Sequence, residues 1–206
     1  MRIVLATSNA GKLREIAAVF AGVSELAQVQ FLTLHDVGLA GYEYDEVGDT
    51  FAANAIGKAA AVAELSGLPA IADDSGLCVD ALGGAPGVRS ARWAGASATD
   101  GVRNEMLLKL MADVPDDRRT ARFVCAAAVS VLGENYCITE GTSEGLISSY
   151  LKGAHGFGYD PLFWLPEFGC TMAELSADEK NRISHRGKAL YALIKPLCEL
   201  KAEWSR

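Results

Sequence analysis

Short apolar runs alternate along this chain with stretches in which apolar residues recur every three or four positions. Residues 3–6 form a continuous apolar run, which is typical of a strand buried on both faces. Residues 13–20 then place apolar side chains at helical spacing, and residues 51–66 repeat this pattern up to a stop at Gly67. Another helix is expected near 102–111. This alternation of strands and helices predicts an α/β fold.

The second half of the chain contains two long apolar stretches and then an amphipathic helix. Residues 121–132 and 136–142 are rich in β-branched and small residues and flank a turn at 133–135, so we expect a hairpin of long strands. Leucines and an isoleucine within 190–200 share one helix face, which we assign to the core. Since no repeat or linker interrupts the pattern, residues 1–206 are expected to form a single domain.

Composition narrows the classes of function. A chain of 206 residues, 50% of them hydrophobic, can bury a substantial core. A net charge of -7 argues against a protein that grips nucleic acid through its phosphates, although a local cluster of lysines can still bind free nucleotides. Five cysteines without a Cys-x-x-Cys pair suggest neither a disulfide framework nor a zinc site. With no signal-peptide pattern and no apolar stretch of about 18 residues, we expect no membrane partner and a cytoplasmic location.

An apolar run at 68–72 ends in two adjacent carboxylates, Asp73 and Asp74, which Ser75 follows. In open α/β folds ligands bind beyond the carboxyl ends of strands, so we expect this strand to end at the acids and to present them in a cleft. Mg²⁺ prefers one or two carboxylates with water and substrate phosphate, so the pair indicates a site for this cation. Asp and Ser are also ordinary turn residues, and the glycine-rich stretch 76–87 predicts a loop.

A second candidate site lies between the first strand and the first helix. Backbone N–H groups at the start of a helix are unpaired and carry partial positive charge, so a loop of small residues with a lysine can cradle a phosphate. The spacing is not that of a P-loop, and plain helix capping by Ser8 and Asn9 is the alternative interpretation. The loop consists of Thr7, Ser8, Asn9, Ala10, Gly11 and Lys12.

A third candidate site is the glycine-rich stretch 153–161. Glycine lets the backbone approach a ligand closely, and Phe157 and Tyr159 offer flat rings on which a nucleobase can stack. Gly158 separates the two rings and Asp160 follows them. A tight loop whose aromatic residues belong to the core is the alternative interpretation.

Five strings of residues, taken in order, resemble the inosine/xanthosine triphosphate pyrophosphatase family over nearly the whole chain. They are Thr7-x-Asn9-x-x-Lys12, Asp73-Asp74-Ser75-Gly76-Leu77, Gly83-Gly84-Ala85-Pro86-Gly87-Val88, Phe157-Gly158-Tyr159-Asp160-Pro161 and Lys180-Asn181-x-x-Ser184-His185-Arg186. The resemblance implies a two-lobed α/β unit with a long central mixed sheet flanked by helices, an active-site cleft between the lobes, and a homodimer. It also implies hydrolysis of dITP, ITP, XTP and dXTP to the monophosphate and pyrophosphate.

The resemblance also implies roles for individual residues. Asp74 would be the general base and a ligand of Mg²⁺, with Glu46 as a second ligand and Asp73 as a direct or indirect one; one ion per subunit is expected, and Mn²⁺ could replace it. The triphosphate would be bound by residues 7–12 together with Lys58 and Ser75. The base and sugar would be surrounded by Phe157, Gly158, Tyr159, Asp160, Lys180, His185 and Arg186.

The chain departs from many family members at Ala53, where they carry a glutamate, so the metal region could differ in this protein. Glu46 lies among several acids, and a solvated acidic loop is the alternative interpretation of that segment. Two other functions stay open. One is a related pyrophosphatase for modified pyrimidine or guanine nucleotides, against which the string Ser184-His185-Arg186 argues; the other is a nucleotide-binding sensor without catalysis.

Overall fold

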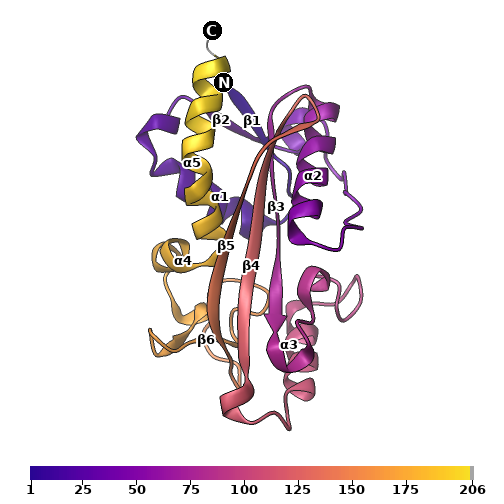
Figure 1. Cartoon of the computed structure of the whole chain (residues 1–206), viewed down its shortest axis with the longest axis vertical. Helices are drawn as coiled ribbons and strands as arrows, with labels where there is room; N and C mark the ends of the chain where they lie inside the picture. Colours follow the sequence, from indigo (N-terminus) through magenta and orange to yellow (C-terminus); the bar gives the residue numbers. More distant parts are fainter. Residues whose placement is uncertain (205–206) are drawn as a thin grey trace. The chain divides into compact units, whose positions relative to one another are not determined.

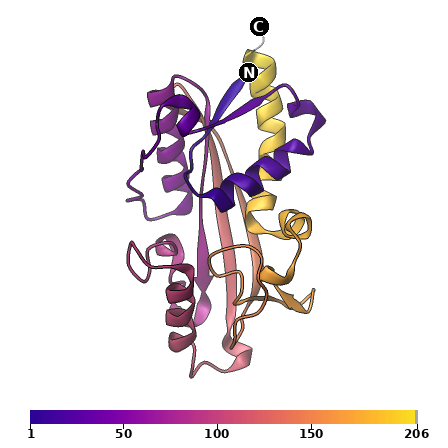
Figure 2. The ribbon, with the colours of Figure 1, turned by 180° about the vertical axis from the view of Figure 1, so that it is seen from behind.

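The structure is a computed structural model that describes residues 1–204. Its strands are β1 (Arg2–Leu5), β2 (Gln30–Thr33), β3 (Ala70–Val79), β4 (Thr120–Val131), β5 (Glu134–Ile147), β6 (Phe163–Leu165) and β7 (Cys170–Thr171). Its α-helices are α1 (Ala10–Ala21), α2 (Phe51–Ser66), α3 (Asp100–Leu110), α4 (Ala177–Ile183) and α5 (His185–Trp204). Figures 1 and 2 show these elements from opposite sides. Within the described part of the chain, no helix is both long and apolar enough to cross a membrane.

One mixed sheet contains all seven strands, in the order β2-β1-β3-β4-β5-β6-β7. β1 pairs in parallel with β2 and β3, whereas β6 pairs antiparallel with β5 and β7. The sheet and its flanking helices confirm the predicted α/β class. The expected hairpin is also present, because β4 and β5 are neighbours joined across residues 132–133.

Contacts within the chain divide it into two compact units. Unit 1 comprises Met1–Asp74, Cys125–Gly141 and the described residues from His185 onward; unit 2 comprises Ser75–Val124 and Thr142–Ser184. Each unit is assembled from separate chain segments, so no single linker joins them. The prediction of one domain over residues 1–206 stays a prediction.

In unit 1 both faces of the sheet are covered by helices, which explains the continuous apolar run of the first strand. Successive side chains of a strand point to opposite faces. Ile3 and Leu5 therefore pack with α1 and α5, whereas Val4 and Ala6 pack with α2. Figures 1 and 2 show α2 on the opposite side of these strands from α1 and α5.

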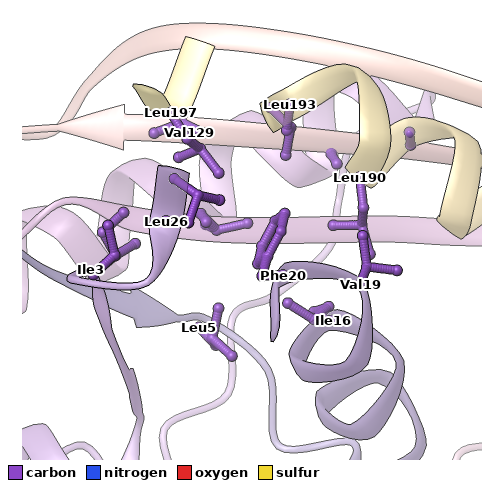
Figure 3. Packing of buried hydrophobic residues seen from close by; sticks show 14 of the residues in the cluster. Ile3, Leu5, Ile16, Val19, Phe20, Leu26, Val129, Leu190, Leu193 and Leu197 are labelled. Carbon is purple, nitrogen blue, oxygen red and sulfur yellow. The ribbon is translucent and has the colours of Figure 1, made fainter. Parts of the chain in front are cut away.

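The α1/α5 face holds the larger side chains. Phe20 of α1 and Leu190 and Leu193 of α5 pack with Leu26 and with Val129 of β4 (Figure 3). The α2 face is instead built largely from alanines of the helix and of the strands. The predicted core face of the last helix is confirmed, since Leu190, Leu193, Leu197 and Leu200 are buried.

The core of unit 2 is separate from these two clusters. It gathers residues of β3, β4, β5, β6 and α3 with residues 159–175, among them Leu77, Leu107, Phe163 and Met172. Phe123 and Phe163 pack ring against ring, with centroids 4.5 Å apart.

The expected end of the third strand at its two acids is wrong, because β3 continues through Asp73 and Asp74 to Val79. Beyond the acids, Leu77 and Val79 are fully buried in the core of unit 2, which favours continuation of the strand. The predicted loop at 76–87 therefore begins only after Val79. Adjacent carboxylates are tolerated inside a buried strand here because each has polar or charged partners.

Candidate active site

The loop between β1 and α1 has the geometry of a capped helix start. The Asn9 side-chain oxygen accepts hydrogen bonds from the backbone N–H groups of Gly11 (2.8 Å) and Lys12 (3.1 Å). The hydroxyl of Thr7 accepts one from the Asn9 N–H at 3.2 Å. Ser8, Asn9 and Ala10 are exposed. Capping by Asn9 is thus confirmed, and the binding of phosphate by this loop stays a prediction.

Asp73 lies at the centre of a buried ionic cluster in unit 1. Its Oδ2 is 2.9 Å from Nζ of Lys12 and 3.0 Å from Nε of Arg186, and its side chain is fully buried. Burial by itself would raise the pKa of Asp73, but the charges of Lys12, Arg186 and Lys58 outweigh it and hold the pKa far below its ordinary value. Asp73 is therefore an anion that fixes the two cations.

Arg186 is held from its other side as well. Its side chain is 2% exposed and forms an ion pair with Glu15 of α1 in addition to the one with Asp73. The charges of Asp73 and Glu15 overcome burial and raise its pKa above the ordinary value. His185 precedes it as the first residue of α5 and is also buried. Contact of either residue with a base stays a prediction.

Asp74 has surroundings opposite to those of Asp73. It is 4% exposed, and its Oδ2 accepts a hydrogen bond from Nδ2 of Asn54 at 2.9 Å. Burial raises the pKa of Asp74, and the negative charge of Glu46 raises it further. Glu46 in turn forms an ion pair with Lys58, with 2.7 Å between Oε1 and Nζ. The structure thus selects Glu46 from its acidic segment as the residue whose charge acts on Asp74.

These surroundings fit a divalent cation. Two carboxylates that repel each other gain from a positive ion between them, and Mg²⁺ commonly takes one or two carboxylates and completes its shell with water and phosphate. Asp74 and Glu46 have this character, although Oε1 of Glu46 also faces Lys58. In Asp73, by contrast, a single oxygen, Oδ2, faces two cations, Lys12 and Arg186. Within residues 1–204, no three or more His, Cys, Asp or Glu side chains gather as a metal-binding group.

Two residues near this cluster were not singled out from the sequence. Asn54 is buried in α2, where its side chain donates to Asp74 and accepts from the backbone N–H of Gly48 at 2.8 Å. In the sequence, Asn54 stands in an alanine-rich stretch that predicts a helix, and its burial is visible only in the structure. Glu15, the partner of Arg186, is a half-buried residue of α1 and gave no signal of its own in the sequence.

Unit 2 contains the second group of predicted site residues. Oδ2 of Asp160 is 2.5 Å from Nζ of Lys180 and accepts a hydrogen bond from the backbone N–H of Phe157 at 2.9 Å. The same Nζ lies 4.7 Å from the centroid of the Phe157 ring, in cation–π geometry. Asp160 and Lys180 are both buried, while Phe157 is half-buried.

Tyr159 agrees with the alternative interpretation of this stretch, in which the aromatic residues belong to the core. It is 4% exposed, belongs to the core of unit 2, and donates a hydrogen bond from its hydroxyl to the backbone oxygen of Ser90 at 3.0 Å. Its ring is thus a core ring, and Phe157 is the half-buried aromatic side chain of the pair. Ser75 is half-buried in β3, directly after Asp74.

The predicted site residues therefore fall into two groups. Unit 1 gathers Lys12, Asp73 and Arg186 in one ionic cluster, and Asp74, Glu46 and Lys58 in a second whose charges act on one another. Unit 2 gathers Phe157, Asp160 and Lys180.

Comparison with known proteins shows the family of this chain. The model of the Ham1 family matches residues 3–196. A dITP/XTP pyrophosphatase of Listeria monocytogenes is 49% identical over 199 residues, covering 97% of this chain and 96% of the relative. A dITP/XTP pyrophosphatase of Geobacillus kaustophilus is 51% identical over 193 residues, covering 93% of this chain and 91% of the relative.

Solved structures give the same family. A HAM1 protein from Coxiella burnetii has a TM-score of 0.84 and 39% identity, covering 98% of this chain and 99% of its own. The Ham1 protein of Staphylococcus aureus has a TM-score of 0.82 and 35% identity, covering 98% of this chain and 100% of its own. The resemblance inferred from five sequence motifs is thereby confirmed over nearly the whole chain, and this protein belongs to the Ham1 family.

Proposed function

We propose that this protein is a hydrolase that converts dITP, ITP, XTP and dXTP to the corresponding monophosphate and pyrophosphate, and so removes these purine nucleotides from the nucleotide pool. One observation carries the proposal. Asp74 is a buried carboxylate whose pKa is raised, and it stands directly beside an aspartate that holds Lys12 and Arg186. The names of the similar proteins, dITP/XTP pyrophosphatase, support the choice of substrates.

The chemistry follows from these charges. In our proposal, water attacks the α-phosphorus and pyrophosphate leaves. Asp74 accepts a proton from that water, a task for which a raised pKa suits a carboxylate because the ideal base has a pKa nearer to the working pH. Lys12 and Lys58 lie in the same unit and would offset the negative charge of the triphosphate. No covalent intermediate is needed.

We further propose Mg²⁺ as cofactor, one ion per subunit, held by Asp74 and Glu46. When bound, the ion would offset charge on the phosphates. Asp73 would act indirectly, because it is engaged by Lys12 and Arg186. Titration calorimetry with MgCl₂, and with MnCl₂ as a substitute, should detect binding that is weakened in Glu46→Gln and in Asp74→Asn. Equal binding by all three proteins would contradict this assignment.

Base selection is proposed to rest on the carbonyl that hypoxanthine and xanthine carry where adenine carries an amino group. A hydrogen-bond donor in the site can bond to this carbonyl but not to the amino group of adenine. Such hydrogen bonds can discriminate between bases by about 10⁴ or more. Phe157 would supply the stacking ring, with Lys180 and Asp160 beside it. Rejection of guanine, which keeps the carbonyl, needs a further device.

The deciding experiment is product analysis. The purified protein with Mg²⁺ is incubated with ITP, XTP, ATP and GTP, and pyrophosphate is distinguished from inorganic phosphate. We expect pyrophosphate from ITP and XTP only, and none from Asp74→Asn. Asp113→Asn is the matched control, since Asp113 is an exposed aspartate outside the site. Inorganic phosphate as product, or binding without turnover, would overturn the proposal in favour of a phosphatase or a nucleotide sensor.

Two wider properties belong to the proposal: a homodimer, which the family resemblance implies, and a cytoplasmic location, which the sequence pattern predicts. The protein would act as a homodimer in the cytoplasm. Sedimentation equilibrium of the purified protein and fractionation of cells that express it would test them. A monomer at micromolar concentration would contradict the first, and recovery outside the cytoplasmic fraction the second.

A further inference from the structure

Gly158 lies between the two aromatic residues of unit 2, and both of its backbone polar groups are held by one turn of α3. Its N–H donates to Oδ2 of Asp100 at 2.7 Å, and its carbonyl oxygen accepts from Nδ2 of Asn104 at 3.0 Å. Asp100 and Asn104 are four residues apart on α3 and therefore share one helix face. Neither residue was singled out from the sequence.

These two hydrogen bonds fix consecutive peptide groups. The N–H of Gly158 belongs to the peptide that joins it to Phe157, and its carbonyl belongs to the peptide that joins it to Tyr159. Gly158 has a φ of +63°, a left-handed conformation that residues with side chains seldom adopt. Asp100 and Asn104 thus act on a segment whose backbone conformation depends on glycine, and they set the direction in which the Phe157 ring leaves the chain.

Asp100 is itself held in place. It is the first residue of α3, and its other carboxylate oxygen forms an ion pair with Arg103. Arg103 also donates to the backbone oxygens of Ala91 (2.9 Å) and Ala98 (2.6 Å). The carboxylate that meets Gly158 is therefore oriented by a further set of contacts, and its negative charge strengthens the hydrogen bond that it accepts.

Asn104 shows that the contact with Gly158 has a cost. Its residue is 4% exposed, and within the described part of the chain its Oδ1 is buried without a hydrogen-bond partner. A buried polar atom left unpaired lowers stability, and an apolar side chain of similar volume would avoid that loss. The hydrogen bond that Nδ2 of Asn104 donates to Gly158 explains why an asparagine stands at this buried position.

We propose that Asp100 and Asn104 are positioning residues that set the affinity and selectivity of this protein for the purine base. They act through the Gly158 backbone on Phe157, whose ring is contacted by Lys180 and whose backbone N–H donates to Asp160. This inference deepens the proposed function and rests on it, because it takes Phe157 as the ring against which the base stacks.

The test combines a measurement that needs no activity with one that does. Hydrogen–deuterium exchange over residues 153–162 reports the hydrogen bond at the Gly158 amide whether or not the protein turns over. Steady-state kinetics with ITP and GTP report KM, kcat and selectivity. The variants are Asp100→Ala, Asn104→Ala, the conservative Asp100→Asn, which keeps an acceptor for the Gly158 N–H, and Asn104→Leu, which keeps volume without a donor. Glu105→Ala, an exposed position on the same helix, is the control.

We expect amide exchange at Gly158 to become about tenfold faster in Asp100→Ala and to stay near the wild-type rate in Asp100→Asn and Glu105→Ala. In both alanine variants and in Asn104→Leu, KM for ITP should rise about tenfold while kcat changes by less than about threefold, and the preference for ITP over GTP should fall. Substitution of a residue with only a structural role would lower stability without raising KM selectively over kcat.

The possible failures are distinguishable. An unchanged exchange rate in Asp100→Ala would overturn the clamp itself, by which we mean the hold of Asp100 and Asn104 on the Gly158 backbone. Faster exchange with unchanged KM and selectivity would overturn the positioning role while leaving the proposed function intact. A wild-type protein that releases no pyrophosphate from ITP would overturn the proposed function, and with it the assignment of this clamp to base selection, whatever the exchange experiment shows.

Discussion

The adjacent residues Asp73 and Asp74 differ in what their charges do for the fold. Asp73 neutralises Lys12 and Arg186 inside unit 1, so its ionised form stabilises the native state. Asp74 is buried and near Glu46, so its ionised form is disfavoured there. Neighbouring carboxylates in one strand thus have opposite effects, and the same substitution should separate them.

Asp73→Asn should destabilise the protein by about 3–5 kcal/mol, because it leaves two buried cations without their anion. Asp74→Asn keeps an oxygen that can accept from Asn54 and removes the repulsion by Glu46, so it should retain or gain stability while losing activity. Urea unfolding in metal-free buffer would measure both. Equal losses in the two variants would show that the ion pairs of Asp73 contribute nothing specific.

Tyr159 gives a prediction about alkaline pH. Burial raises its pKa to about 12 in the folded protein, against about 10 for an unfolded chain. A folded pKa above the unfolded value means that the contribution of this group to stability is complete below about pH 10 and is lost as pH rises toward 12.

Tyr159→Phe should cost about 1 kcal/mol at neutral pH, because the hydrogen bond to the Ser90 backbone oxygen is lost. The advantage of the wild type should then shrink as pH rises from about 10 to about 12, since phenylalanine has no proton to lose. Urea midpoints of both proteins across this range would show it. A stability advantage of the wild type that stays constant with pH would contradict a raised pKa of Tyr159 in the folded protein.

At the scale of elements, helix ends offer a matched comparison. α2 ends at Gly67, whose φ of +65° and ψ of 16° are left-handed, whereas α1 ends at Gly22 with a right-handed φ of -78°. An added Cβ meets no atom within 4 Å at Gly67 and only an ordinary contact of 3.7 Å at Gly22. Any difference between alanine substitutions at the two sites therefore reports backbone conformation.

Gly67→Ala should lower the free energy of unfolding by about 1 kcal/mol, because a left-handed residue with a side chain is strained. Gly22→Ala should be neutral or stabilise by up to about 1 kcal/mol, because alanine restricts the unfolded chain. Thermal or urea unfolding of both variants is the measurement, and a loss at Gly22 as large as at Gly67 would contradict the argument from φ.

The same elements show how far sequence reasoning reaches. The bounds of α2 and its end at Gly67 were predicted because helical spacing and the glycine stop are local signals. The continuation of β3 was not, because Asp73-Asp74-Ser75-Gly76 is locally indistinguishable from a turn. What keeps it a strand is the burial of Leu77 and Val79 in the core of unit 2, which is built with residues far away in the sequence, such as Phe163.

The candidate site shows the same division. Asp74 and Lys12 were found because carboxylates after an apolar run and a lysine at the start of a helix are recognisable in the sequence alone. Asn54, Asp100 and Asn104 were not, because each makes its contact with the site through a hydrogen bond to a residue distant in the sequence. Polar residues on helices that hold other residues are visible only once the chain is folded.

For the whole molecule, the central strands determine how the chain should unfold. The division between the units falls inside β3 after Asp74, inside β4 after Val124 and inside β5 after Gly141. Three consecutive strands of the sheet thus belong partly to unit 1 and partly to unit 2. Because a strand cannot lose its pairing in one half without weakening the other, we predict a single cooperative transition, which is also the behaviour expected of one domain.

The prediction is tested by weakening one core at a time. Leu193→Ala removes volume from the unit 1 cluster and Leu162→Ala from the unit 2 core, both at fully buried positions, and each should cost about 2–5 kcal/mol. Urea unfolding with pulsed hydrogen exchange gives separate midpoints for β1 and for β6. We expect each variant to lower both midpoints equally, because the native state is lost as a whole. If Leu193→Ala lowers only the midpoint of β1 and Leu162→Ala only that of β6, the units unfold independently and residues 1–206 form two domains that share a sheet rather than one.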